Sequence, residues 1–528
     1  MQTIAVAGSE VKRCTRAAGV VGGATLVSRL LGFVRDMVIA GFFGAGMRSD
    51  AFFVAFRIPN LMRRLFAEGT LSIAFIPVFT EYLTEKGKPE ALRLACAALR
   101  FTAVLLVLVV IPGMWASPVL VRVFAPGFID DPIQFEMTVG MTRLMFPYLF
   151  FICLTALCMG ILNSLGHFAG PALAPVLLNI AIIFAAFFIS PNLAEPITGL
   201  AWGVLIGGLL QLVFQAPFLV RHGVRLFQKA RFFHPALSRI GNTLLPAVLG
   251  AAVYQINVLV GTLLASLLPR GSVSYLYYAD RLVQFPLGIF AMAMATAVLP
   301  SLSRQAAAGD MAGLRDTFAH TLRLVFFITL PAMVGLIVLR EPIIGLLFQR
   351  GAFDAGAVRA TAEALLFYSL GLPAFSGVRI VASTFYALQD TRTPMKTAVI
   401  AIFFNLFLGV ILMGPMGHGG LALATSSASI LNLILLIFAL RRKLGAPEWA
   451  KIVNSACKSV ICSVIMGGTV WGIAHWTIPW EGGTSTRLVS GLLLCITSGC
   501  IFYSGIAFLM KSPEMKIVLA AAGKGVRK

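Results

Sequence analysis

Nine charged side chains lie within two otherwise apolar stretches near the start of the chain. They are Arg29, Arg35, Asp36, Asp50, Arg57, Arg63, Arg64, Glu68 and Glu81. An ionisable group at bilayer depth costs several kcal/mol, so it is rare and usually faces a polar interior. Arginine suits the binding of a phosphate or a carboxylate, because its planar guanidinium donates two parallel hydrogen bonds and stays charged. The cluster predicts a hydrated, mostly cationic cavity inside a membrane protein, with room for an anionic group.

Helical spacing sorts these side chains into faces, since successive residues of a helix turn by about 100°. One stripe of the second stretch holds Asp50, Arg57, Arg64 and Glu68. Arg63 points away from that stripe. In the first stretch, Arg29 and Asp36 share a face, whereas Arg35 turns off it. We expect Glu81 at the cytoplasmic rim, in contact with water.

Two later stretches add to the predicted cavity. Asp280 and Arg281 lie in the eighth apolar stretch, and Arg379 lies in the tenth. Acidic neighbours would hold the guanidinium groups when no substrate is bound. For the four acids a purely structural role, in which they pair with bases and pin helices together, stays an alternative; these acids are Asp36, Asp50, Glu68 and Asp280. Bases outnumber acids in the first two stretches, so pairing within the cluster is incomplete.

The elements that position these residues are membrane-spanning helices. The chain has 528 residues, of which 59% are hydrophobic and only 12% are charged, and no water-soluble globular protein has this composition. A span needs roughly 20 apolar residues. Fourteen stretches qualify, at 20–43, 50–81, 97–124, 137–162, 171–190, 197–220, 241–268, 274–303, 321–348, 360–388, 395–414, 419–440, 456–476 and 488–510. The predicted fold is an all-α polytopic membrane protein with about fourteen transmembrane helices.

The net charge of +21 follows membrane topology rather than nucleic-acid binding. Lys and Arg concentrate in alternate loops, as the positive-inside rule requires, which places both termini in the cytoplasm. The basic loops need no partner beyond anionic lipid headgroups. We expect no nucleic-acid partner.

An internal repeat divides the predicted spans. AFFVAFR, which ends at Arg57, matches YLYYADR, which ends at Arg281, and NSLGHFAGP matches YALQDTRTP, which ends at Pro394, at an offset of about 220 residues. Each copy holds six spans, so both copies enter the membrane from the same side. Transporters with such parallel repeats place the substrate between the halves and alternate access to it. The predicted parts are a cytoplasmic segment 1–19, a first lobe 20–220, a basic cytoplasmic linker 221–240, a second lobe 241–440, a basic cytoplasmic loop 441–455, two extra helices 456–510 and a cytoplasmic tail 511–528.

Signals for enzymatic chemistry are weak. The six histidines form no HxxxH or HExxH pattern, the eight cysteines form no CxxC pair, and there is no P-loop. We therefore expect no cofactor, no metal site and no ATP hydrolysis. Energy would come from an ion gradient, from the membrane potential or from the gradient of the substrate itself.

Three segments resemble one known family, and the similarity covers nearly the whole chain. The run SRLLGFVRDMVIAGFFGAGMRSDAFFVAFRIPNLMRRLFAEGTLSIAFIPVFTEY resembles the start of the MurJ (MviN) lipid II flippases. GSVSYLYYADRLVQFPLGIFAMAMATAVLPSLSR resembles their eighth span, and SGVRIVASTFYALQDTRTP resembles their junction between spans ten and eleven.

The resemblance implies an exporter of the multidrug/oligosaccharidyl-lipid/polysaccharide type, with two six-helix lobes and two extra helices that form a groove for a lipid tail. The implied substrate is lipid II, the polyprenyl pyrophosphate that carries the peptidoglycan precursor. The implied location is the bacterial cytoplasmic membrane, with the protein acting as a monomer beside peptidoglycan synthesis enzymes. The arginines that the resemblance assigns to the cavity are Arg29, Arg35, Arg63, Arg64 and Arg281. The matching acidic positions are Asp36, Asp50, Glu68 and Asp280.

Other functions stay open at this point. A flippase of another polyprenyl-linked oligosaccharide would share both the architecture and the basic cavity. A drug exporter for cations should have an acidic cavity instead. A membrane enzyme such as a lipid-phosphate transferase would need clustered acids or histidines at one membrane face, and none is found in the sequence. A scaffold without transport activity would tolerate the loss of Arg29 or Arg281.

Overall fold

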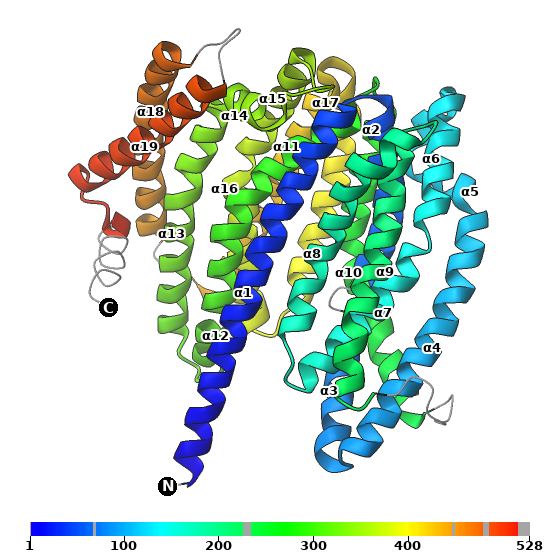
Figure 1. Cartoon of the computed structure of the whole chain (residues 1–528). Coiled ribbons are helices and arrows are strands. Elements are labelled where there is room, and N and C mark those ends of the chain that lie inside the picture. The colour runs from blue at the N-terminus through cyan, green and yellow to red at the C-terminus, as the bar shows by residue number, and fades with distance from the viewer. Residues whose placement is uncertain (1, 67–69, 225–233, 446–448, 479–484, 516–528) are drawn as a thin grey trace. The chain divides into compact units, whose positions relative to one another are not determined.

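Helices form the whole of the regular structure that can be followed along the chain. The computed structural model describes residues 2–66, 70–224, 234–445, 449–478 and 485–515. Within these ranges every regular element is helical, which confirms the predicted all-α class (Figure 1). The chain forms two compact units, Met1–Gly271 and Ser272–Lys528.

The first unit is a bundle in which α8 packs against both α1 and α9, and α10 packs against α2 and α3 (Figure 1). Its elements are α1 (Gln2–Phe43), α2 (Met47–Phe66), α3 (Thr70–Glu85), α4 (Lys88–Trp115), α5 (Ser117–Phe124), η1 (Pro126–Asp130), α6 (Pro132–Met145), α7 (Tyr148–Ser164), α8 (Ala169–Phe184), η2 (Ala185–Ile189), η3 (Ser190–Asn192), α9 (Thr198–Arg221) and α10 (Pro235–Ser266).

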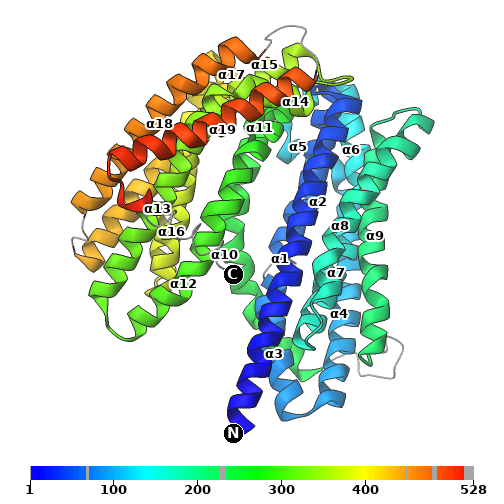
Figure 2. The same ribbon diagram turned by 60° about the vertical axis from the view of Figure 1, so that its left-hand side comes forward.

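The second unit is built around α13, which packs against α12, α16 and α18, while α19 packs against α18 (Figure 2). Its elements are α11 (Ser272–Pro286), η4 (Leu287–Ala291), α12 (Met292–Ala307), α13 (Met311–Val338), α14 (Arg340–Phe348), α15 (Ala355–Leu370), α16 (Leu372–Ala387), α17 (Arg392–Leu444), α18 (Trp449–Thr477) and α19 (Ser485–Leu509). A buried apolar cluster that includes Phe318, Phe385 and Leu440 joins α13, α16 and α17.

The helices agree with the predicted spans. One helix, or two or more consecutive ones, covers each of the fourteen predicted ranges within the described residues. Nine helical segments of these residues are long and apolar enough to cross a membrane, or ten if the bent pair α15–α16 forms one span. The charge-bearing helices α1 and α2 are not among them. The exact number of spans stays a prediction.

Several predicted spans are interrupted between consecutive helices. α4 gives way to α5 at Ala116, and α13 gives way to α14 at Leu339. The long helix α17 contains a residue with non-helical backbone angles, Gly417, which separates the two spans predicted at 395–414 and 419–440. The second predicted span, 50–81, is covered by α2 and α3, and residues 67–69 between them lie outside the described ranges.

The repeat is visible in the local structure of each unit. Asp131 accepts a hydrogen bond from the Gln134 amide at the start of α6, and Asp354 accepts one from the Ala357 amide at the start of α15. Both acids satisfy an amide that the first turn of a helix would leave without a partner. The compact units divide at Gly271, so α10 lies in the first unit although the repeat assigns it to the second copy. The limits of the two repeat copies, the end of the first lobe at 220 and the start of the second at 241, stay a prediction.

Candidate functional site

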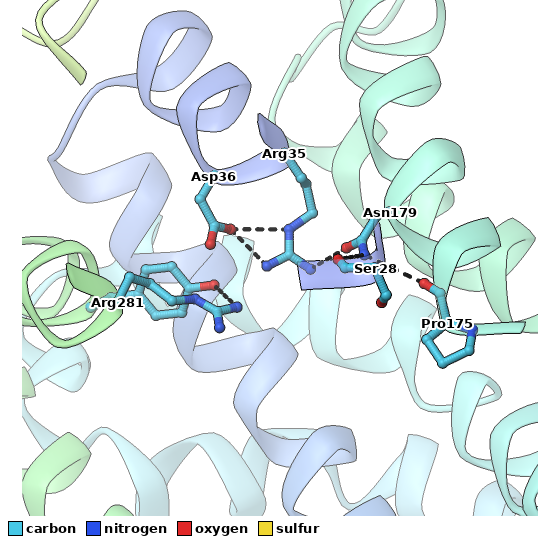
Figure 3. Close-up of polar contacts among 7 residues, drawn as sticks. Ser28, Arg35, Asp36, Pro175, Asn179 and Arg281 are labelled. Carbon is cyan, nitrogen blue, oxygen red and sulfur yellow. Dashed lines mark hydrogen bonds and ion pairs between the residues drawn. The ribbon is translucent and has the colours of Figure 1, made fainter. Parts of the chain in front are cut away.

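Two buried charges of the first unit, Arg35 and Asp36, form a network between α1 and α8. Arg35 is 6% exposed and Asp36 is 0% exposed. The Arg35 guanidinium donates from Nε and Nη2 to Asp36 Oδ1 at 3.0 and 2.6 Å. Its Nη1 donates to Asn179 Oδ1 at 3.1 Å, so the guanidinium lies between the carboxylate and the amide (Figure 3). The helical phase placed Asp36 on the face of Arg29 and Arg35 off it, whereas here Arg35 and Asp36 bond to each other.

Asn179 is a functional candidate that the sequence reading missed. Its Nδ2 donates to the Ser28 carbonyl at 3.1 Å and to the Pro175 carbonyl at 3.4 Å (Figure 3). Gly32 on α1 faces the Asn179 amide, and a Cβ added there would lie 3.7 Å from it, in ordinary van der Waals contact. The sequence does contain a signal for this residue, since Asn179 is a single amide in the apolar run 171–190. A polar side chain within a span usually bonds to a neighbouring helix.

The stripe predicted on α2 meets the end of α10. Asp50 is 2% exposed, and its Oδ2 accepts a hydrogen bond from the Gly271 amide at 2.5 Å. Arg57 donates to the hydroxyl of Thr262 on α10. Burial of these polar groups is acceptable because each has a partner. Asp36 and Asp50 both bond to groups of their own unit, which is in part the structural role that the sequence left open for the acids.

The remaining sequence-predicted residues of the first unit lie apart from this network. Arg29 is exposed on α1, although Asp36 on the same predicted face is buried. Arg63 donates from Nε to Asn60 on its own helix at 2.8 Å, and Arg64 is partly buried. Glu68 lies outside the described residues. Glu81 forms an ion pair with Arg239 of α10 at 2.8 Å, and both side chains are in contact with solvent.

The far end of α10 is tied to the turn that precedes α6. Arg270 donates to Asp131 Oδ2 at 3.0 and 2.5 Å. Burial alone would raise the pKa of Asp131, but the hydrogen bonds from Arg270 and from the Gln134 and Ile133 amides, together with the charge of Arg270, outweigh it, and the pKa lies below its ordinary value. The Gly127 amide donates to the Ser266 hydroxyl at 3.3 Å. Within the first unit, α10 is thus held near both of its ends.

The second unit contributes a smaller set of charges. Arg281 on α11 donates to the Tyr277 hydroxyl at 3.1 Å and lies 5.3 Å from the centre of its ring. Asp280 accepts a hydrogen bond from Gln284 one turn later. Arg379 on α16 contacts the sulfur of Met292 at 2.7 Å. Over the ranges that the structure describes, no group of three or more His, Cys, Asp or Glu side chains could hold a metal ion.

Comparisons with known proteins agree with one another. The family model described as "Lipid II flippase MurJ" matches residues 39–490. A "Probable lipid II flippase MurJ" of Vibrio cholerae serotype O1 is 38% identical over 92% of this chain and 97% of that protein. A "Lipid II flippase MurJ" of Burkholderia cenocepacia is 35% identical over 94% of this chain and 97% of that protein.

Solved structures give the same result for the fold. A lipid II flippase MurJ in an inward closed conformation is 28% identical, covers 93% of this chain and 99% of its own, and has a TM-score of 0.77. An inward-facing multidrug resistance MATE family transporter of the MOP superfamily covers 80% of this chain and 95% of its own, with a TM-score of 0.67 and 17% identity.

Proposed function

Because the chain belongs to the MurJ family of lipid II flippases, we propose that it carries lipid II from the inner to the outer leaflet of the cytoplasmic membrane for peptidoglycan synthesis. It is a multi-pass membrane transporter and not a catalytic enzyme. The structural relatives of the MOP superfamily are consistent with alternating access as the way in which it moves its substrate.

The observation that carries the proposal is the buried Arg35–Asp36–Asn179 network. A charged pair at bilayer depth costs free energy to bury, and it is often no more stable than an apolar packing of the same size. A network kept at that cost supports a role in binding rather than in stability alone. A pyrophosphate offers Arg35 the same bidentate acceptor as a carboxylate. We infer that the head group competes with Asp36 for the Arg35 guanidinium.

The other cationic side chains would act with Arg35 on the head group. Arg29 is exposed on α1 and is available to an entering anion. Arg57, Arg63 and Arg64 on α2 would extend the cationic stripe. Arg281 and Arg379 are the candidates of the second unit, where Asp280 and Gln284 are hydrogen-bonded neighbours. Asp50 and Glu68 complete the proposed set of site residues.

The lipid tail needs a path that stays in hydrocarbon. Large apolar side chains are exposed along the two extra helices, among them Val464 and Trp471 on α18 and Leu493, Ile501 and Phe508 on α19. We propose that the tail runs along this pair while the head group crosses. We further propose that both termini are cytoplasmic, that the protein acts as a monomer beside peptidoglycan synthesis enzymes, and that no cofactor takes part, with the energy drawn from an ion gradient or the membrane potential.

The test is depletion with complementation in bacterial cells. Lipid II on the outer leaflet is measured after depletion and again after expression of wild type, of Arg35→Ala, or of Arg122→Ala, an exposed arginine on α5 outside the proposed site. We expect depletion to remove outer-leaflet lipid II, and wild type and Arg122→Ala to restore it while Arg35→Ala does not. If outer-leaflet lipid II does not change on depletion, while another polyprenyl-linked oligosaccharide accumulates, the function belongs to that substrate instead.

A further inference from the structure

The turn between α16 and α17 is closed by an ion pair. Asp390 accepts hydrogen bonds from the Thr393 amide at 3.0 Å and the Thr393 hydroxyl at 2.6 Å. It also pairs with Lys443, which lies near the end of α17, two residues before Gly445. The hydrogen bond from Lys443 holds the pKa of Asp390 well below its ordinary range. The Asp390 carboxylate therefore stays charged at every physiological pH.

The first unit has the same turn with different side chains. Gly166 has φ 81° after α7, and Gln389 has φ 57° after α16. In both turns the next residue donates its amide to a carbonyl five positions earlier, at 2.8 Å for His167 and 2.9 Å for Asp390. This is the hydrogen bond that closes a helix end through a left-handed residue. His167 therefore occupies the place of Asp390.

The partner also differs between the two copies. The His167 ring stacks on Phe218 with centroids 4.7 Å apart, and it lies 5.4 Å from the ring of His222. His222 follows α9 and lies directly before Gly223, whereas Lys443 lies two residues before Gly445, a position that Arg221 holds in the first unit. The turn after α7 thus carries an imidazole where the second unit has a carboxylate, and a second imidazole lies 5.4 Å from it.

The surroundings of His167 favour an uncharged imidazole. His222 Nδ1 is 2.7 Å from the Phe218 carbonyl, a distance at which Nδ1 carries the proton and donates it. His167 Nε2 is buried without a hydrogen-bond partner. Burial, followed by the neighbouring His222, lowers the pKa of His167. Two imidazolium ions at this spacing would repel each other, whereas two neutral rings can stack.

No other charge near His167 and His222 would offset the repulsion between two protonated rings. α8 begins with Ala169, Gly170 and Pro171, which carry no charge. On α4, whose Leu92 lies 3.2 Å from where a Cβ on Gly223 would be, Glu90 is already bonded to Arg93 at 2.8 Å and to His234 at 3.4 Å. The first helical turn also carries Lys88, and exposed Arg221 precedes His222. These cations would add to the repulsion on protonation.

We propose that His167 and His222 form a pH-sensitive latch at the cytoplasmic end of the first unit, closed when both rings are neutral and opened by acidification of the cytoplasm. In the matching turn of the second unit, the Asp390 carboxylate keeps its charge over this range of pH. The proposal rests on the transport function and the cytoplasmic placement proposed above. Because the folded state takes up the His167 proton less readily than the unfolded state, the stabilisation is complete above about pH 6.5 and is lost as the pH falls below it.

The test replaces the two imidazoles by a carboxylate and an ammonium. Purified wild type and the double variant His167→Asp/His222→Lys are reconstituted in vesicles, and lipid II transport is measured at about pH 7.5 and about pH 5.5. Hydrogen exchange of residues 162–170 is followed at the same two values and is expressed relative to the intrinsic exchange rate of an unstructured peptide at each pH. Because the pKa of His167 is lowered, its ring is protonated only in part at about pH 5.5. We therefore expect wild type to lose part of its transport in acid and to exchange faster in this segment, and the double variant to change little in either measurement.

Two further variants keep the outcome decisive. His167→Gln is neutral at both pH values and should also lose the acid response, which covers the case in which the double variant does not fold. His475→Gln, at an exposed histidine stacked on Trp471 of α18, should respond to acid as wild type does. Equal exchange of residues 162–170 in wild type at both pH values would overturn the latch. Faster exchange in acid without any lipid II transport at either pH would retain the latch and reject the proposed function.

Discussion

Asn179 offers the sharpest test of how the buried network is positioned. Asn179→Leu keeps the volume of the side chain nearly constant but removes both its acceptor and its donor. Arg35 then loses the acceptor that it reaches at 3.1 Å, and the Ser28 and Pro175 carbonyls lose a donor. The Arg35–Asp36 pair would remain, but the guanidinium would no longer be fixed from the side of α8.

The expected cost follows from the three bonds. A hydrogen bond to a charged group contributes about 1.5–3 kcal/mol, whereas bonds between membrane helices average about 0.6 kcal/mol. One bond of the first kind and two of the second sum to about 3 kcal/mol. The bond to Arg35 dominates that figure, so the variant tests the cation more than the helix contact.

A matched control lies on the neighbouring pair of helices, α8 and α9. Gln211 of α9 is 2% exposed and donates from Nε2 to the Ala174 carbonyl of α8 at 3.0 Å, without contact to a charged group. Gln211→Leu should cost only about 0.6 kcal/mol. Thermal unfolding in detergent gives the two stabilities, and outer-leaflet lipid II per folded molecule gives the two activities.

The two variants should separate in both measurements. We expect Asn179→Leu to lower the unfolding midpoint several times more than Gln211→Leu and to lower transport per folded molecule, which Gln211→Leu should leave near wild type. Asn179→Asp keeps the acceptor for Arg35 and should recover part of the transport. Equal midpoints and equal transport for the two leucine variants would refute the reasoning, because Arg35 would then not depend on Asn179.

Three further predictions concern stability, each read from unfolding in detergent. Gly127→Ala should destabilise the first unit by about 1–3 kcal/mol, because its Cβ would lie 2.1 Å from the Ser266 carbonyl oxygen; an unchanged midpoint would contradict this contact. Gln389→Gly should stabilise the second unit by about 1 kcal/mol, since φ is 57° at Gln389; a loss of stability would show that its side chain matters more than its backbone. Asp131→Asn should remove the ion pair with Arg270, which contributes below about 1 kcal/mol because Arg270 is exposed. Since the pKa of Asp131 is lowered, wild type should lose this advantage in stability only as the pH falls below about 3.8. A wild-type advantage that persists in stronger acid would contradict the contribution of the pair.

Much of the fold could be predicted because the solvent is a bilayer. Lipid requires every backbone group of a span to bond within the span, so an apolar run of sufficient length is a helix. Helical phase also predicted that Arg35 lies off the face of Arg29 and that Arg63 lies off the stripe of α2. In the structure, Arg63 bonds to Asn60 of its own helix. These predictions need only the order of residues along one helix.

The features that the sequence did not reveal depend on neighbouring helices. The change from α4 to α5 at Ala116 lies in a run whose apolar pattern is continuous, so hydropathy carries no trace of it. Asn179 was invisible as a site residue because its importance comes from α1, which is 144 residues away along the chain at Arg35. Asp50 was placed on a cationic stripe, whereas its closest partner is a backbone amide, that of Gly271. Backbone donors have no signature in a sequence.

The two copies of the repeat share backbone geometry more than charge. Both begin an equivalent helix with an aspartate cap, Asp131 or Asp354, and both end one with a left-handed residue. The copies differ in the polar side chains added to that frame, with five arginines in the first two predicted spans of one copy and Arg281 in the matching span of the other. Local hydrogen bonds are needed by any copy that folds, whereas charges at bilayer depth are costly unless they are used. An anionic substrate would therefore meet most of its cationic partners on the first unit.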